Sequence, residues 1–260
     1  MAFKHGTPNS IVTDGLVFCI DPANVSSYPR TGATVTDIIG NTTGTLSGPN
    51  APNNTPQWEN TNGGIFNFDG TDDNISPGSL TSFQNDISTS NAFSVSLWLK
   101  TSNTSTNNLM LFGNQGNSWT QYETMWLYLN EGYLRFSIMT DPDSPPHDYS
   151  RIKNNLTTNS INDNNWHHVC CTIGVNPSTT YLVSKVYIDG TLIKTVLATL
   201  QGQYQQEIDI VNNDYYIGAR GSNSIQGFDG DISTLQLYIK ELSTSEVTQN
   251  YNALKNRFRT

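Results

Sequence analysis

The stretch AFSVSLWLK, Ala92–Lys100, alternates large apolar residues with small or polar ones. Successive side chains of a β-strand point to opposite faces of a sheet, so this alternation sorts the residues into two sets. The apolar set is Phe93, Val95, Leu97 and Leu99. The other set is Ser94, Ser96, Trp98 and Lys100. The stretch is therefore predicted to be a β-strand with its apolar face in a hydrophobic core.

Short segments of the same kind recur along the chain, with turn residues between them. They include GLVFCID (15–21), GGIFNFDG (63–70), WHHVCCTIGV (166–175), YLVSKVYIDG (181–190), DYYIGARG (214–221) and DGDISTLQLYIK (229–240). About a dozen strands are expected, and no helical period separates them, which argues against a parallel sheet. The pattern predicts an all-β fold, a two-sheet antiparallel jelly-roll sandwich.

The composition limits the classes of function. The chain has 260 residues, which suffices for one sizeable core. Its formal net charge is −9, and no basic stripe is present, so nucleic-acid binding is not expected. No apolar stretch is long enough to cross a bilayer. The three cysteines, Cys19, Cys170 and Cys171, are an odd number without a disulfide framework, which predicts reduced, buried thiols.

The two ends of the chain carry different signals. The start, MAFKHGTPNSIVTDG, lacks a hydrophobic signal region, so folding in a cytoplasm is expected. Residues 1–12 are interpreted as a polar arm and residues 13–260 as one domain. At the other end, Ser243 and Glu246 form a capping box. An apolar stripe follows it, which predicts a helix over 243–258 that packs on the sandwich.

Three segments rich in Gly, Pro, Asn, Ser or Thr are predicted to be exposed loops at the ends of the sandwich. They are 37–62, 101–108 and 140–151. The last contains two adjacent prolines, which cannot donate hydrogen bonds to the ladder of a central strand.

Six segments together resemble a known family. They are FNFDGTDDNI (66–75), FSVSLWLK (93–100), NNWHHVCCTI (164–173), KVYIDGTLI (185–193), YYIGARG (215–221) and FDGDISTLQLYIKELSTSEV (228–247). Their order is similar to that of laminin-G-like, concanavalin A-like domains. The opening over 13–41 and the closing helix resemble those of such domains in virion structural proteins of tailed phages. The resemblance implies a non-enzymatic virion surface protein: a capsid decoration, a fibre or a knob module.

Two turns rich in aspartate are candidates for a metal site. FDGTDD supplies Asp69, Asp72 and Asp73, and FDGDI supplies Asp229 and Asp231. Laminin-G-like relatives often hold one calcium ion at an edge of the sandwich. Asp72 and Asp73 are the best candidate ligands, because they lie at the end of a predicted strand, where oxygen atoms are free. Calcium takes about six to eight oxygen ligands, so two loops would have to converge. Alternatively, these carboxylates accept hydrogen bonds from the amides of their own turns.

The segment QEIDIVNND, Gln206–Asp214, resembles the catalytic strand of laminarinase-type retaining β-glucanases. Such an enzyme needs two carboxyl groups about 5–5.5 Å apart. The last acid of the glucanase pattern corresponds here to Asn212, an amide that cannot protonate a leaving group. Glu207 and Asp209 are therefore interpreted as a chance similarity, and no enzymatic activity is expected.

The motif NNWHHV raises the question of a catalytic or metal-binding histidine. Trp166 and His168 share one face of the predicted strand, and His167 takes the other. Because no carboxylate or cysteine partner is fixed within the motif, a structural role is favoured, with Trp166 in the core.

Aromatic residues on loops are candidates for glycan contact, because sugar rings stack on aromatic rings. Trp119, Tyr122 and Tyr149 are the candidates. The expected partners are other virion proteins and a host-surface polysaccharide, and the protein is expected to be an oligomer within the particle. A stand-alone adhesion module that binds carbohydrate is the alternative, and a glycoside hydrolase is a third.

Overall fold

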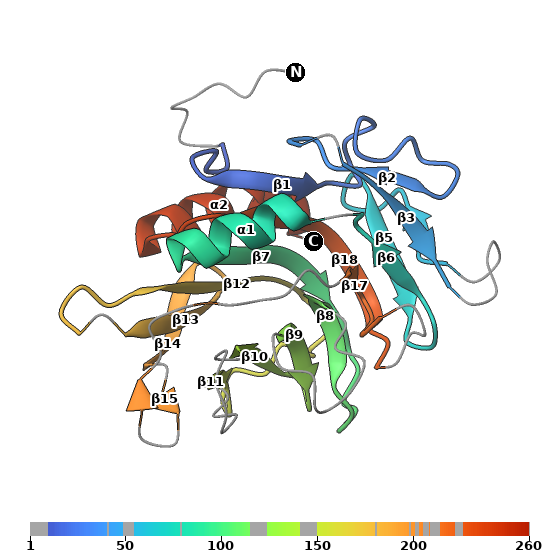
Figure 1. Cartoon of the computed structure of the whole chain (residues 1–260). Coiled ribbons are helices and arrows are strands. Elements are labelled where there is room, and N and C mark those ends of the chain that lie inside the picture. The colour runs from blue at the N-terminus through green and yellow to red at the C-terminus, as the bar shows by residue number, and fades with distance from the viewer. Residues whose placement is uncertain are drawn as a thin grey trace.

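The computed structural model describes most of the chain and shows two stacked antiparallel sheets (Figure 1). The described residues are 10–40, 42–48, 55–78, 80–114, 124–140, 150–179, 181–197, 199–200, 203–204, 208, 214–221 and 226–259. Every strand pairing among them is antiparallel, so the predicted all-β sandwich is confirmed.

Sheet A has eight strands in the order β14-β13-β12-β7-β18-β5-β4, with β1 paired to β18 beside this path. The bounds of its strands are β1 Leu16–Ile20, β4 Gln57–Glu59, β5 Ile65–Asp69, β7 Phe93–Lys100, β12 Trp166–Val175, β13 Leu182–Ile188, β14 Thr191–Leu197 and β18 Asp229–Tyr238. The strand β7, from which the prediction began, lies between β12 and β18 in the middle of the sheet.

Sheet B also has eight strands, in the order β11-β10-β9-β8-β17-β6-β3-β2. Its strands are β2 Thr34–Thr36, β3 Thr43–Ser47, β6 Asn74–Ser76, β8 Leu109–Asn114, β9 Thr124–Asn130, β10 Tyr133–Thr140, β11 Ser150–Asn155 and β17 Tyr215–Ile217. A third, two-stranded sheet is formed by β15 Thr199–Leu200 and β16 Gln203–Tyr204, and β15 contacts β11 of sheet B.

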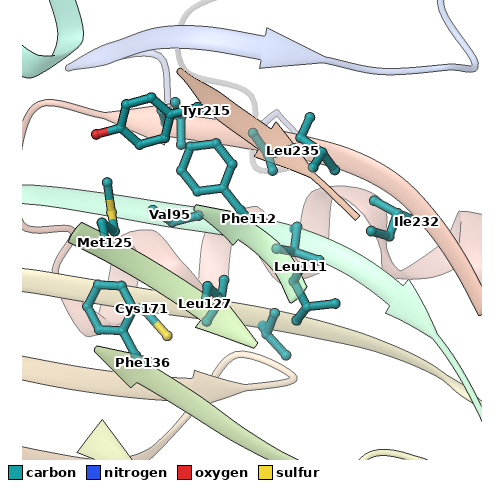
Figure 2. Packing of buried hydrophobic residues seen from close by; sticks show 14 of the residues in the cluster. Val95, Leu111, Phe112, Met125, Leu127, Phe136, Cys171, Tyr215, Ile232 and Leu235 are labelled. Atoms are coloured by element: carbon teal, nitrogen blue, oxygen red, sulfur yellow. The ribbon is translucent and has the colours of Figure 1, made fainter. Parts of the chain in front are cut away.

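The main core lies between the two sheets. Val95 and Cys171 of sheet A face Phe112, Met125 and Phe136 of sheet B across this space (Figure 2). All five side chains are fully buried, and the ring of Phe112 stacks on that of Tyr215 at 5.2 Å. The apolar face predicted for β7 is therefore the face that forms the core.

The outer face of β7 is also buried, which the alternation did not predict. The helix α2, Thr244–Phe258, covers it, and its N-terminus has the predicted capping box of Ser243 and Glu246. Trp98 stacks on Phe258 with ring centroids 4.4 Å apart. A second cluster of buried residues on this outer face includes Cys19 and Cys170. The three cysteines are buried and free, as predicted, with Cys170 and Cys171 on opposite faces of the sheet.

A second helix, α1 (Thr81–Ser90), was not predicted. Its first residues lack a side-chain cap, and its sequence TSFQNDISTS carries only Phe83 and Ile87 as large buried apolar residues. Phe83 packs edge-on against Phe93 at 6.0 Å and against Tyr215 at 6.3 Å. Tertiary packing rather than helix propensity stabilises this helix.

The prediction of a continuous exposed loop over 37–62 is wrong. The strands β3 and β4 lie within this segment. Each is short and pairs with longer-range partners, β3 with β2 and β6, and β4 with β5. Asp37 is buried as well, and its Oδ1 accepts hydrogen bonds from the backbone N–H groups of Cys19 and Ile39. Composition failed here because short strands that pair with distant segments need little apolar sequence of their own.

No helix in the described part of the chain is long and apolar enough to span a membrane.

Candidate functional site

The first candidate site is the turn that joins β5 to β6. Asp69 ends β5, and Asp72 and Asp73 directly precede β6. Gly70 has a φ of 77°, a conformation that glycine adopts without steric cost, and so reverses the chain within a few residues. As a result, one carboxylate oxygen from each of the three aspartates lies within 4.8 Å of the others. The structure therefore brings together the three residues predicted to bind a metal.

The three carboxylates are hydrogen-bonded to different extents. Oδ1 of Asp69 accepts hydrogen bonds from the N–H groups of Thr71 and Asp72 at 2.8 and 3.4 Å, so Asp69 forms the turn interactions named as the alternative. Oδ2 of Asp73 accepts the N–H of Asp69 at 3.0 Å. Its Oδ1 is buried and has no hydrogen-bond partner within the described residues.

The environment of Asp73 disfavours a bare charge. Burial, followed by the nearby charges of Asp69 and Asp72, raises the pKa of Asp73 to about 6, although the hydrogen bond from the Asp69 N–H lowers it. A hard cation would supply the missing partner for Oδ1 and favour the ionised carboxylate. The donor set and the orphaned oxygen thus fit a metal ion.

The second aspartate-rich turn does not join this cluster. Asp229 lies opposite Asp69 in the β5–β18 ladder, but its Oδ2 accepts a hydrogen bond from Asn103 Nδ2 at 2.9 Å. Asp231 bonds to Asn67 at 2.8 Å and lies 3.7 Å from the ammonium of Lys100. Both carboxylates therefore have other partners.

The predicted glycan-contact residues lie outside the described residues, but the strands that flank them are described. Trp119 and Tyr122 belong to the connection from β8 to β9, and Tyr149 to the connection from β10 to β11. Met139 pairs with Thr124, so both connections leave the same end of sheet B. The β5–β6 turn lies at the opposite end, because β6 runs antiparallel to β17 and β17 antiparallel to β8. The metal candidates and the glycan candidates are thus separate.

The glucanase-like segment also falls mostly outside the described residues, including Glu207, Asp209 and Asn212. Ile208 is described: it is buried, and its N–H donates to Asn91 Oδ1 at 2.7 Å. Asp214 is exposed.

The two histidines have partners that the sequence did not reveal. His167 lies between two carboxylates, with Nδ1 2.9 Å from Asp189 Oδ2 and Nε2 3.1 Å from Asp163 Oδ1. Since both ring nitrogens are engaged, His167 acts as a structural link between two loops. His168 is buried, and its Nε2 lies 2.8 Å from Ser96 Oγ.

Trp166 is not in the core, contrary to the prediction. It is only partly buried, on the outer side of sheet A, where its ring lies 4.8 Å from that of Phe258. The motif therefore serves to hold α2 on sheet A.

With the geometry described, comparison with known proteins gives the family. The profile of the concanavalin A-like lectin/glucanases superfamily matches residues 69–248. The chain belongs to this superfamily. No curated protein matches the sequence.

Solved structures share the fold at low identity. Domain 4 of AbnA, an extracellular arabinanase of family GH43 from Geobacillus stearothermophilus, in complex with arabinotriose, is 20% identical with a TM-score of 0.58. The match covers 91% of this chain and 98% of that domain. The binding domain of Paraclostridial Mosquitocidal Protein 1 is 18% identical with a TM-score of 0.62, over 93% of this chain and 53% of that one.

The binding domain of botulinum neurotoxin serotype D/C VPI 5993 is 14% identical with a TM-score of 0.59, over 92% of this chain. The present chain spans 52% of that domain, so it corresponds to about half the length of each of these two toxin binding domains.

Proposed function

We propose that this chain is a non-catalytic carbohydrate-binding module that acts at the surface of a tailed-phage virion. The observation that carries the binding part is the match to nearly the whole of an arabinanase domain in complex with arabinotriose. The virion part rests on the resemblance of residues 13–41 and of the closing helix to phage structural proteins. Recognition is assigned to loops, because a rigid sandwich tolerates variation there.

The glycan is expected at the end of sheet B where β8, β9, β10 and β11 are connected. The candidates Trp119, Tyr122 and Tyr149 belong to two connections whose flanking strands meet at this one end, so we assign them to a single ligand.

We assign calcium to the cluster of Asp69, Asp72 and Asp73, with a structural role. The ion would hold the β5–β6 turn closed by neutralising three carboxylates that otherwise repel each other. Because this turn is at the far end of sheet B from the loop aromatics, calcium is expected to raise stability without contacting the glycan.

A glycan array followed by calorimetry with arabinotriose tests the binding proposal. We expect binding by the wild-type chain, and a loss of about tenfold or more for Trp119→Ala, since stacking on an aromatic ring stabilises a bound sugar. Tyr181→Ala, on the β12–β13 hairpin, is the matched control and should bind normally. An array without any bound glycan would contradict the proposal, and release of reducing sugar from β-glucan would contradict its non-catalytic part.

Thermal unfolding with and without calcium tests the metal assignment. At about 10 mM calcium we expect the melting temperature to rise by about 5 °C, as for a site of the affinity usual in extracellular modules. Asp73→Asn should abolish the rise, whereas Asp86→Asn on the exposed face of α1 should preserve it. The rise should also shrink below pH 6, since protonation of Asp73 competes with the ion. Equal shifts in all three proteins would refute the assignment.

Immunogold labelling of assembled particles tests the virion part, with antibodies against this chain. Labelling of the particle surface is expected, in a symmetric array if the chain is an oligomer there. A chain that binds glycan but labels no particle would instead be a stand-alone adhesion module.

A further inference from the structure

A pocket of about 320 Å³ opens at the lateral edge of the sandwich, and none of the candidate site residues discussed above lines it. It lies where β4, the edge strand of sheet A, faces β2 and β3, the edge of sheet B; β2 and β3 are the blue strands at the right of Figure 1. Its lining residues are Tyr28, Gly32, Ala33, Leu46, Thr55, Pro56, Gln57 and Trp58. This volume is at the lower end of the range for small-ligand pockets, about 300–1,000 Å³.

Two aromatic rings form fixed walls of the pocket. Tyr28 packs edge-on against Phe66 at 5.1 Å, and its hydroxyl donates to the carbonyl oxygen of Gly32 at 2.8 Å. Trp58 is partly buried, and its indole N–H donates to the carbonyl oxygen of Pro22 at 3.0 Å. Because the polar tip of each ring is anchored, the rings are held in place before any ligand arrives.

A cation stands beside these rings. Arg30 is exposed, and its guanidinium lies 5.3 Å from the centre of the Trp58 ring. Within the described residues it has no hydrogen bond and no ion pair. Its φ of 69° is in the left-handed region, which is uncommon for a residue other than glycine. The backbone at Arg30 therefore presents a guanidinium next to an aromatic pocket, with no counterion among the described residues, in a chain of net charge −9.

The rim of the pocket is open and polar. A Cβ atom placed on Gly32 would meet no atom within 4 Å, so there is free space at this position. Gln57 is exposed, and its side-chain amide donates to the carbonyl oxygen of Thr55. The floor is apolar and includes the buried residues Leu46 and Pro56.

We propose that this pocket binds an acidic saccharide, a terminal sugar or disaccharide that carries a carboxylate. The assignment rests on the proposed carbohydrate-binding function and adds a second site with a defined ligand class. The C–H face of the sugar packs on Trp58 and Tyr28, and its carboxylate accepts hydrogen bonds from Arg30, whose planar fork suits that group. A neutral sugar would leave the guanidinium unused.

Calorimetry with sialyllactose and digalacturonate, and with lactose as the neutral counterpart, tests this site. Wild-type chain is expected to bind the acidic sugars at least about tenfold more tightly than lactose, since a charge-assisted hydrogen bond is worth about that factor. Arg30→Gln should abolish this preference while retaining the backbone conformation. Ala33→Glu adds a repelling charge at the exposed rim and should do the same. Arg259→Gln removes an exposed charge at the end of α2 and should have no effect.

The outcomes separate this site from the general function. If the wild-type chain binds neutral glycans on the array but has no preference for acidic sugars, the proposal of an acidic-saccharide site is wrong. The proposed carbohydrate-binding function is then still supported. If the preference exists but persists in both Arg30→Gln and Ala33→Glu, the pocket is the wrong place. If no saccharide of any kind binds, both the proposed function and this site fail.

Discussion

Two tryptophans of sheet A have opposite surroundings, although each belongs to a short alternating strand. Trp98 on β7 is 2% exposed and lies under α2, where its ring stacks on Phe258 at 4.4 Å and on Tyr251 at 5.6 Å. Trp58 on β4 is only partly buried, borders an open pocket and has Arg30 over its ring at 5.3 Å.

The difference shows how one residue type serves two purposes. The middle of sheet A is covered by a helix from the far end of the chain, so aromatic area there contributes to stability. Among the described residues no helix covers the edge at β4, so the aromatic area there borders an open pocket. Substitutions in the first region should therefore change unfolding, and substitutions in the second should change binding.

The largest expected effect is on the stability of the protein when Trp98 is truncated. Trp98→Ala should lower the free energy of unfolding by about 4 kcal/mol, because it removes a fully buried ring and leaves a cavity under α2. Trp58→Ala should cost about 2 kcal/mol, since less of its surface is buried. Urea titration followed by circular dichroism measures both. Equal losses in the free energy of unfolding would show that the surroundings of Trp98 and Trp58 do not differ as described.

The second effect is a loss of stability in acid that depends on His168, which packs against Trp98 at 5.4 Å. Burial lowers the pKa of His168 from 6.5 to about 4. Between pH 6.5 and pH 4, His168 is therefore protonated in the unfolded chain but neutral in the folded chain. The free energy of unfolding falls as the pH falls through this window. The loss in the free energy of unfolding that His168 causes across this window is about 3 kcal/mol.

Urea midpoints of wild type and His168→Gln across this pH range isolate that contribution, because Asp73 and the other carboxylates titrate in both proteins. The wild type should lose more stability in acid than the variant. His167 makes the stability depend on pH in the opposite direction. Burial lowers its pKa, but the hydrogen bonds to Asp189 and Asp163 raise it overall. The stabilisation that His167 contributes is therefore lost as the pH rises above 6.5. Parallel pH profiles of the two proteins would rule out a buried neutral His168.

The smallest expected effect is on the stability of pocket variants. Arg30→Gln should change the free energy of unfolding by less than about 0.5 kcal/mol, since the side chain is exposed and only its cation–π contact is lost. The melting temperature should therefore remain that of the wild type while acidic-sugar binding is lost. A clear drop in melting temperature would instead make Arg30 a structural residue and remove the contrast with Trp98.

The parts of the fold that the sequence predicted are those in which local pattern and tertiary environment agree. The alternation of β7 predicted the face that forms the main core, and the apolar stripe after Ser243 predicted a helix that packs on sheet A. The sequence failed at α1, which has no cap and only two large buried apolar residues, and at β3 and β4, whose polar composition resembles a loop. In each case packing against distant residues decided the structure.

The sequence predicted some features of the candidate sites but not others. Asp69, Asp72 and Asp73 are close in sequence, so their proximity could be expected. The exclusion of Asp229 from that cluster could not, because it depends on Asn103, far away in the chain. The partners of His167 were likewise not predicted: one lies four residues before it and the other in the turn between β13 and β14. Trp119, Tyr122 and Tyr149 stay predictions.

The sequence by itself determined the layered antiparallel fold and the acidic turn, because strand alternation and turn chemistry act over a few neighbouring residues. Only the tertiary structure decided which faces α2 covers and where a pocket remains. It placed Tyr28 and Trp58 in the lining of one pocket and left Arg30 without a counterion among the described residues. These features arise where the edges of two sheets meet, and no local pattern specifies which edges those are.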